Sequence, residues 1–180
     1  MKKAEEKEKK YERVVQEFAP VRDADSKVLI LGTAPSRKSR EVGFYYGHPQ
    51  NRFWKLMALI LGEAVPQSIE EKKSFLLRNG IALHDVIHSC DIIGSSDSSI
   101  RNAEPADLER ILAVTGKIPV ICNGGTSYKL YKKYQEKKLG IEAIQMPSTS
   151  PANAAWSLER LKEEWGKALL PCMEGQVEER

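Results

Sequence analysis

The segment KVLILG, Lys27 to Gly32, decides the fold class of this 180-residue chain. Val, Leu or Ile occupies each position from 28 to 31, and a glycine ends the run. An uninterrupted apolar run of this length is typical of a strand that is buried on both faces of a sheet. Such strands occur in parallel sheets covered by helices, so the rest of the chain is expected to alternate helices with similar strands.

The remaining sequence has that alternation. Helical spacing of apolar residues predicts helices over residues 51–61, 69–79, 105–115, 126–138 and 158–170. Short apolar runs predict further strands at 81–87, 118–125 and 141–147, whereas the polar segment 88–104 is predicted to be a loop. Strands joined through helices form right-handed crossovers, so these elements predict an α/β fold with a mainly parallel sheet.

Length and composition indicate a single globular domain over residues 1–180. Hydrophobic residues make up 41% of the chain and charged residues 29%, which leaves enough apolar surface to bury a core. Lysines and glutamates alternate near the start, so residues 1–20 are predicted to form a charged helical extension. The sequence contains no run of ~20 apolar residues and no signal peptide, so we expect a cytoplasmic protein that does not enter a membrane. We also expect a monomer.

The side chains that commonly bind metals predict no metal or cofactor site. The three cysteines are far apart in the sequence and form no CxxC pair: Cys90, Cys122 and Cys172. The three histidines have no HExxH spacing: His48, His84 and His88. His84 lies inside a predicted strand and is interpreted as a core or sheet histidine, whereas His88, next to a strand end, could be structural or functional.

Four loops follow the predicted strands, where ligands of parallel sheets bind. They are GTAPS (32–36), HSCDIIGSSDSS (88–99), NGGTS (123–127) and PSTSPAN (147–153). These loops are rich in Gly, Ser, Thr, Pro and Asn, and their backbone N–H groups and hydroxyls could hold phosphate oxygens. The same residues also make ordinary turns, so each loop alone has a simpler explanation. A net charge of +3 permits contact with nucleic acid but does not argue for it.

The stretch GFYYGHPQNRFW, Gly43 to Trp54, places aromatic and polar residues between a strand and a helix. An exposed ring from Phe44, Tyr45 or Tyr46 could stack on a nucleobase, although these rings could instead cover the adjacent helix. Asn51 precedes the apolar helical run, and asparagine is also a favourable helix N-cap. The residue alone therefore does not decide between a cap and a functional amide.

GTAPS, the HPQNRFW stretch and PSTSPANA together resemble the signature motifs of the uracil-DNA glycosylase superfamily over residues ~27–170. The resemblance is closest to the hypoxanthine (deoxyinosine) branch, with similarity to the mismatch-specific uracil/thymine branch. It implies a three-layer α/β/α fold with a four-stranded, mainly parallel sheet. It also implies that a damaged base is flipped out of DNA and removed by hydrolysis of its N-glycosidic bond.

The resemblance also implies roles for individual residues. Asn51 corresponds to the catalytic asparagine of the hypoxanthine branch, where its carbonyl could orient the attacking water. The residues expected to bind the extracted base are Gly32, Thr33, Ala34, Pro35, Phe44 and Tyr46, with Tyr46 as the stacking platform. The residues expected to contact the DNA backbone and the minor groove are Ser36, Ser39, His48, Ser148, Thr149, Ser150, Pro151 and Asn153.

Two positions depart from the pattern of other branches. Ala34 stands where most branches have Asp or Asn, and Met146 stands where others have His or Asn, so uracil removal by the usual residues is not expected. Asp85, Asp91 and Asp97 are further candidates for water activation, and each could equally cap a turn. The sequence therefore predicts a monofunctional glycosylase for hypoxanthine in DNA, with a mismatch-specific uracil/thymine glycosylase and a catalytically silent nucleic-acid-binding domain as alternatives.

Overall fold

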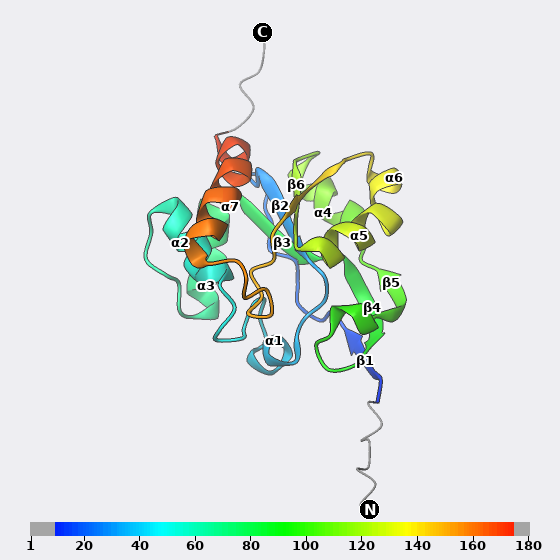
Figure 1. The fold of residues 1–180 in the computed structure, drawn as a ribbon. Coiled ribbons are helices and arrows are strands. Elements are labelled where there is room, and N and C mark those ends of the chain that lie inside the picture. Colours follow the sequence, from blue (N-terminus) through cyan, green and yellow to red (C-terminus); the bar gives the residue numbers. More distant parts are fainter. Residues whose placement is uncertain (1–9, 175–180) are drawn as a thin grey trace, which may run out of the picture.

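The fold was obtained as a computed structural model that describes residues 10–174. At its centre lies a sheet of four strands in the order β3-β2-β6-β7 (Figure 1). These strands are β2 (Val28–Gly32), β3 (Ile81–Asp85), β6 (Val120–Asn123) and β7 (Ala143–Met146). Every pair of neighbours in this sheet is parallel, which confirms the predicted α/β fold.

Strand β2 is buried on both faces, as its sequence predicts. Val28 and Ile30 belong to one hydrophobic core cluster, whereas Leu29 and Leu31 belong to a second cluster on the opposite face. Successive side chains of a strand point to opposite faces, so an uninterrupted apolar run supplies both cores at once. All four side chains are 0% exposed.

Helices cover both faces of the sheet and complete three layers (Figure 1). The first core contains residues from α2 (Phe53–Leu61), α3 (Ile69–Arg78) and α7 (Leu158–Met173). The second contains residues from α4 (Leu108–Thr115) and α5 (Gly125–Tyr134), and α6 (Glu136–Leu139) packs against it. The six-residue helix α1 (Arg37–Val42) follows β2. The helix predicted from residue 105 begins only at Leu108, because Arg101–Pro105 pairs as a strand and the Asp107 side chain caps the helix.

A second, antiparallel sheet was not predicted. It contains β1 (Glu12–Val15), β4 (Ile87–Ile92) and β5 (Arg101–Pro105) in the order β1-β4-β5. The prediction of a loop over 88–104 was therefore wrong, with only the 3₁₀ turn Asp97–Ser99 and its neighbours left between β4 and β5. The predicted N-terminal helix was also wrong for residues 12–15, because β1 pairs with β4 and buries Val14 beside Cys90. Residues 1–9 lie outside the described part of the chain.

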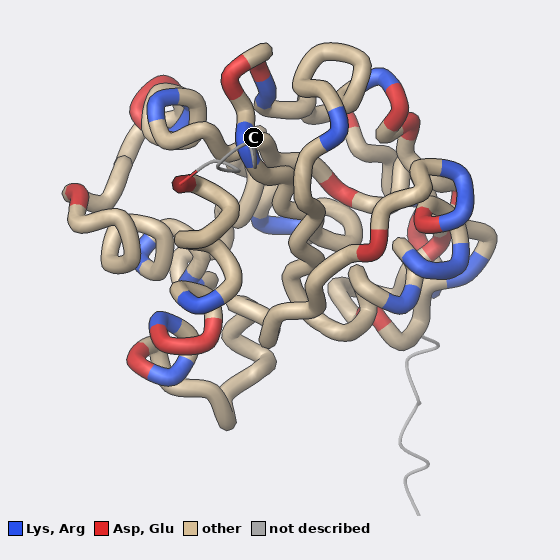
Figure 2. Tube along the Cα trace, turned by 90° about the horizontal axis from the view of Figure 1, so that it is seen from above, with Lys and Arg blue, Asp and Glu red and all other residues tan. Residues whose placement is uncertain are grey.

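Charges of both signs occur along the outer helices on each flank of the fold (Figure 2). Within residues 10–174, no helix combines the length and the apolar character needed to cross a membrane.

Candidate active site

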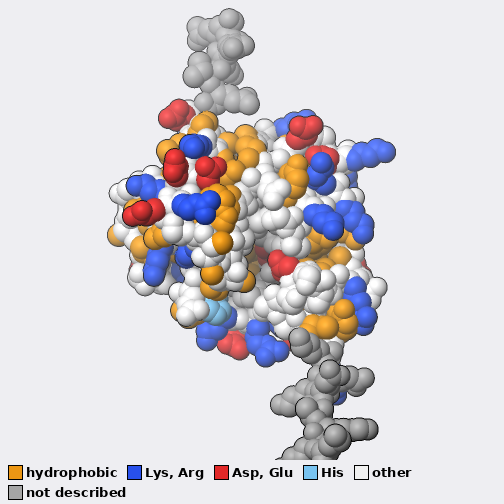
Figure 3. All heavy atoms as spheres, in the orientation of Figure 1, with side chains coloured by type: hydrophobic (Ala, Val, Ile, Leu, Met, Phe, Trp, Pro, Cys, Tyr) orange, Lys and Arg blue, Asp and Glu red, His pale blue; other side chains and the backbone are white. Residues whose placement is uncertain are grey.

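A cavity of about 980 Å³ opens at the carboxyl edge of the central sheet. The residues around it follow strands β2, β3, β6 and β7, and the loop after β4 closes one side. Figure 3 shows the hollow in the middle of this face, with Lys and Arg side chains toward the edge of the molecule. Among the residues predicted for catalysis, base binding or DNA contact, all except Phe44 and Pro151 line this cavity. The cavity thus lies at the edge of the sheet where ligands of parallel sheets bind.

The side chain of Asn51 is held by two hydrogen bonds to its carbonyl oxygen. The backbone N–H of Phe53 donates to Asn51 Oδ1 at 3.0 Å, and the Thr149 hydroxyl donates to the same oxygen at 2.9 Å. A carbonyl oxygen has two lone pairs, so both are taken. Orientation of a water molecule by this carbonyl stays a prediction, and it would need a third donor at the same oxygen. The amide nitrogen is the group of Asn51 that remains free to act in the cavity.

Thr149 is itself fixed by Asn123, at the end of β6. Asn123 Nδ2 donates to Thr149 Oγ1 at 3.0 Å, and the backbone N–H of Thr149 donates to Asn123 Oδ1 at 3.0 Å. Thr149 is 0% exposed, so its side chain positions Asn51 and does not reach the protein surface. A chain of hydrogen bonds thus runs from β6 through Thr149 to Asn51 and sets the orientation of the Asn51 amide.

Arg52 explains why the two sequence motifs occur together. Its guanidinium donates to the carbonyl oxygens of Ser150 at 2.9 Å and Asn153 at 3.0 Å, and also to that of Trp156. Its backbone N–H donates to the carbonyl of Thr149 at 3.1 Å. One arginine therefore holds a loop about a hundred positions away in sequence, and guanidinium geometry allows several carbonyls to be bound at once.

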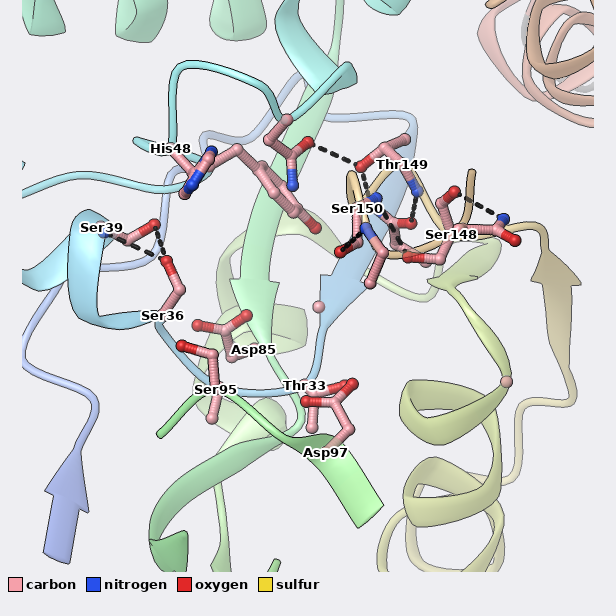
Figure 4. Close-up of a pocket in the computed structure, with 18 of the residues that line it drawn as sticks. Thr33, Ser36, Ser39, His48, Asp85, Ser95, Asp97, Ser148, Thr149 and Ser150 are labelled. Atoms are coloured by element: carbon pink, nitrogen blue, oxygen red, sulfur yellow. Dashed lines mark hydrogen bonds between the residues drawn. The ribbon is translucent and has the colours of Figure 1, made fainter. Parts of the chain in front are cut away.

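The loop 147–153 shapes itself through its own polar side chains. The Ser148 hydroxyl accepts from the N–H of Ser150 at 3.1 Å, and the Ser150 hydroxyl accepts from the N–H of Ala152 at 3.2 Å. Asn153 Nδ2 donates to the Ser148 carbonyl at 3.0 Å. Figure 4 shows Ser148, Thr149 and Ser150 together on one side of the cavity. Pro151 does not line the cavity, and contact of this loop with DNA stays a prediction.

The three consecutive aromatic residues have different positions. Phe44 is 3% exposed and stacks on Trp54 with ring centroids 6.0 Å apart, so its predicted role in base binding is corrected to a role in the core. Tyr45 is also buried, and its hydroxyl lies 2.7 Å from Nδ1 of His84. Tyr46 lines the cavity while its ring stacks on Phe53 at 4.2 Å. Base stacking by Tyr46 stays a prediction.

The backbone at Tyr46 is unusual. Its φ of 52° lies in the left-handed region, which non-glycine residues rarely adopt and which is costly for a bulky aromatic. Its hydroxyl is buried and has no hydrogen-bond partner among the described residues. Burial raises the pKa of this hydroxyl, with a further contribution from the negative charge of Asp85. Strained backbone and an unpaired buried hydroxyl are features that cluster at functional sites.

Ser36 and Ser39 organise the first turn after β2. The Ser36 hydroxyl caps α1 by accepting the N–H of Ser39 at 3.1 Å, and it donates to the Ser39 hydroxyl. Ser39 in turn accepts the N–H of Gly47 at 3.0 Å, which fixes the loop that carries His48. Ser39 is 3% exposed. Both serines therefore have structural partners beside the cavity, and their predicted contact with DNA stays untested.

Ala34 and Met146 bring no polar side chain to the cavity wall. Both line it, and both pack partly against the hydrophobic clusters behind it. Neither position therefore offers a hydrogen-bonding side chain to a ligand, as the sequence indicates. Among residues 10–174, no group of three or more His, Cys, Asp or Glu side chains is placed to hold a metal ion.

Asp85 is the buried acid of the site. It ends β3, is 4% exposed and accepts a hydrogen bond from Gln16 Nε2 through its Oδ2 atom. A Cβ at Gly32 would lie 2.5 Å from Asp85 Oδ1, so only glycine fits beside this carboxyl. Burial raises the pKa of Asp85 to about 7, opposed by the hydrogen bond from Gln16 and assisted by the charge of Asp97.

The other two aspartates have different surroundings. Asp97 lines the cavity from the exposed turn after β4, and Figure 4 shows it near Thr33. Asp91 does not line the cavity and pairs with Arg13 at 3.3 Å. His84 is buried in β3 as predicted, and burial lowers its pKa to about 4, so it stays neutral. His88 is exposed on β4.

Three residues of this arrangement were not among the predicted site residues. Asn123 directly ends a strand in the sequence NGG, so the strand-end rule could have selected it. Arg52 is part of the HPQNRFW motif and could have been recognised as a scaffold residue. Gln16 carries no signal in the sequence, because it lies in a segment whose Lys and Glu content predicts a helix.

The fold and this site define the class to which the chain belongs. The family model "Uracil DNA glycosylase superfamily" matches residues 19–169, and the chain is a member of that superfamily. A protein named hypoxanthine DNA glycosylase from Methanosarcina acetivorans is 35% identical over 149 residues, which cover 82% of this chain and 93% of that protein. A protein of the same name from Methanosarcina barkeri is 32% identical over 155 residues, covering 85% and 96%.

A solved structure agrees with this assignment. The solution NMR structure of a protein from Methanosarcina acetivorans, named a candidate uracil DNA glycosylase, superposes with a TM-score of 0.74 at 32% identity. The match covers 88% of this chain and 98% of that chain. The three-layer arrangement with a parallel four-stranded sheet is therefore shared with a protein of the same superfamily.

Proposed function

We propose that this protein is a DNA glycosylase that flips hypoxanthine out of DNA and hydrolyses its N-glycosidic bond. The observation that carries the proposal is the cavity at the strand ends, into which the amide of Asn51 is fixed by Phe53 and Thr149. Its volume of about 980 Å³ is in the range of small-molecule sites and can hold a flipped nucleotide. The names and coverage of the two Methanosarcina relatives support hypoxanthine as the base.

The chemistry needs a positioned water molecule and donors for the departing base. In an oxocarbenium-like transition state, the bond from C1′ to N9 breaks, negative charge gathers on the purine, and a water oxygen adds to C1′. Asn51 Nδ2 donates a hydrogen bond to the departing purine, because its carbonyl is occupied. The added water then loses a proton to solvent, and the departing hypoxanthine anion takes up a proton from solvent. A neutral amide suffices for this role, since it stabilises charge without accepting a proton.

The reaction leaves an abasic site and an intact strand. A glycosylase that cuts the strand uses an amine to form a Schiff base. Among residues 10–174, no lysine lines the cavity. We also propose that the enzyme acts as a cytoplasmic monomer without a metal or another cofactor, so EDTA should leave base release unchanged.

The test uses duplexes that carry a single hypoxanthine, uracil or xanthine and measures strand breaks before and after alkali. We expect breaks at hypoxanthine only after alkali treatment. Release of uracil or thymine from mismatches in preference to hypoxanthine would favour a mismatch-specific enzyme instead. Binding of these duplexes without base release would indicate a silent DNA-binding domain, and covalent trapping by borohydride would refute the monofunctional mechanism.

A further inference from the structure

The wall of the cavity carries no basic side chain that could attract DNA. Among residues 10–174, no lysine or arginine lines the cavity, whereas the carboxyl groups of Asp85, Asp97 and Glu164 do. DNA is a polyanion, and proteins obtain their sequence-independent affinity for it from contacts of Lys and Arg with phosphates. A glycosylase also has to bind many undamaged sites for each lesion that it finds. This protein therefore needs a positive surface outside the cavity.

The basic residues of α1, which adjoins the cavity, are matched by acids. Arg37 and Arg40 both pair with Glu12, at 3.7 and 3.0 Å. Lys38 pairs with Glu41 at 3.4 Å. An acid a few ångströms from a cation cancels most of its attraction for a third charge farther away. Helix α1 therefore contributes little net attraction for a phosphate chain.

Helices α5 and α6 differ, because they carry a row of lysines without acidic partners. Within residues 10–174, the members of this lysine row are exposed and form no ion pair: Lys129, Lys132, Lys133 and Lys137. The two helices contain five lysines and one acid, whereas the whole chain has a net charge of only +3. Figure 3 shows Lys and Arg side chains gathered to one side of the hollow, where Figure 1 places α5 and α6.

Two tyrosines hold lysines of this row without cancelling their charge. Lys132 Nζ lies 5.5 Å from the ring centroid of Tyr128, and Lys133 Nζ lies 5.0 Å from that of Tyr134. An aromatic face attracts an ammonium group through its quadrupole but carries no net charge. Tyr131 is 0% exposed and anchors the opposite face of α5 in the core. The lysine row is thus held on a fixed helix and keeps its full positive charge toward solvent.

The lysine row begins next to the cavity. Gly125 is the first residue of α5 and lines the cavity. Lys129, Lys132 and Lys133 follow it at spacings of three and four, which place them on one helix face. At about 1.5 Å per residue, Lys129 lies ~6 Å and Lys133 ~12 Å along the helix from Gly125. Base pairs are stacked about 3.4 Å apart, so the row can reach phosphates up to about four base pairs from the flipped nucleotide.

We propose that the lysine row on α5 and α6 is a docking surface for the duplex on one side of the lesion, where it contacts phosphates without reading the sequence. This inference rests on the proposed function. The row supplies the salt-dependent affinity that keeps the enzyme on undamaged DNA, and the cavity supplies the chemistry on the base. Binding to DNA and release of the base therefore depend on different residues.

The first experiment measures binding of an undamaged duplex of about 30 base pairs by fluorescence anisotropy at salt concentrations from about 50 to about 200 mM. One variant combines three substitutions in the row: Lys129→Gln, Lys132→Gln and Lys133→Gln. The control removes the same charge from exposed lysines elsewhere: Lys27→Gln, Lys162→Gln and Lys167→Gln. The row variant should bind at least about tenfold more weakly at the lowest salt, and its salt slope should be smaller by about 2–3, since each lost phosphate contact removes about 0.9. The control should change the slope by less than about 1.

A charge-retaining variant separates loss of charge from loss of structure. It carries arginine at the same three positions of the row and should bind DNA as the wild type does. Melting temperatures are measured for every variant. Equal DNA affinities of the row variant and the control, or a loss of affinity that the arginine variant shares, would overturn the inference.

The second experiment uses base release to locate the row on the DNA. Single-turnover release at saturating enzyme should stay within about twofold of the wild type for the row variant, because its substituted residues do not line the cavity, whereas kcat/KM should fall at least about tenfold. Shortening the duplex to about two base pairs on one side of hypoxanthine should abolish this difference in kcat/KM, and shortening the other side should leave it. A difference that survives both shortenings would overturn the placement of the row. A wild type that releases none of the deaminated bases would refute the proposed function, whatever DNA affinities the variants have.

Discussion

The amide of Asn51 can be tested by replacing it with a carboxylate of the same shape. In the wild type, the Phe53 nitrogen and the Thr149 hydroxyl oxygen lie 3.0 and 2.9 Å from Asn51 Oδ1. In Asn51→Asp, one carboxylate oxygen should accept the same two hydrogen bonds. The helix that follows, α2, has no acidic residue in its first turn, so a negative charge there should stabilise it by about 0.3–1 kcal/mol. The variant should therefore melt at or slightly above the wild-type temperature.

The activity should change in the opposite sense. The second carboxylate oxygen replaces the NH₂ group, so a donor toward the departing base becomes a negative charge beside another developing negative charge. Loss of one such donor typically lowers the rate by about 10²- to 10³-fold. Single-turnover base release at saturating enzyme, compared with a thermal melt of the same sample, measures both quantities. A rate at or above that of the wild type would refute the donor role and indicate that position 51 activates water instead.

Asn51→Ala is the companion variant. It removes the side-chain acceptor of the Phe53 N–H, just before the N-cap residue Arg52, which costs about 1 kcal/mol, and leaves the Thr149 hydroxyl without its acceptor, which costs about 1–3 kcal/mol. Its melting temperature should fall by several degrees. Both variants should be poor enzymes, but only the alanine variant should be unstable. The pair thus separates the role of Asn51 in capping from its role in catalysis.

Three further predictions concern the surroundings of the site. The pKa of Asp85 is about 7 in the folded protein and 3.8 ordinarily, so the folded state loses relative stability as the pH rises from about 4 to about 7. Asp85→Asn should flatten this dependence in thermal melts across the pH range, and a wild-type stability profile that is already flat there would contradict the raised pKa. The groups that face this carboxyl are Gln16, Asp97 and the hydroxyls of Tyr45 and Tyr46. Gly32→Ala should destabilise the protein by about 1–3 kcal/mol and reduce base release, because its Cβ would lie 2.5 Å from Asp85 Oδ1. The control is Gly166→Ala, at a helix position with open space, and it should instead raise the melting temperature. Arg52→Lys should lower base release at least tenfold by loosening the loop 147–153, because a single ammonium cannot replace donors to three carbonyls. If limited proteolysis cuts that loop no faster than in the wild type, this explanation is wrong.

The sequence by itself determined the central sheet, most of the helices and the place of the cavity. The run at 28–31 is apolar at every position, and only a strand with a core on each side buries all of it. The helices that cover it repeat their apolar residues at helical spacing, which is a local property. Because parallel strands end at the same edge, the polar loops after them had to meet there, and GTAPS and PSTSPAN do line one cavity.

The tertiary structure alone decided the features that depend on contacts between residues far apart in the sequence. Residues 12–15 follow a run of Lys and Glu that is typical of a charged helix, yet they form a strand because β4 offers an open edge. Phe44 and Tyr46 look equally suited to bind a base, and packing against Trp54 or Phe53 separates them. The free group of Asn51 depends on Thr149, and the free oxygen of Asp85 depends on Gln16. Hydrogen-bond partners 98 and 69 positions away have no local pattern, because their contact exists only once the chain has folded.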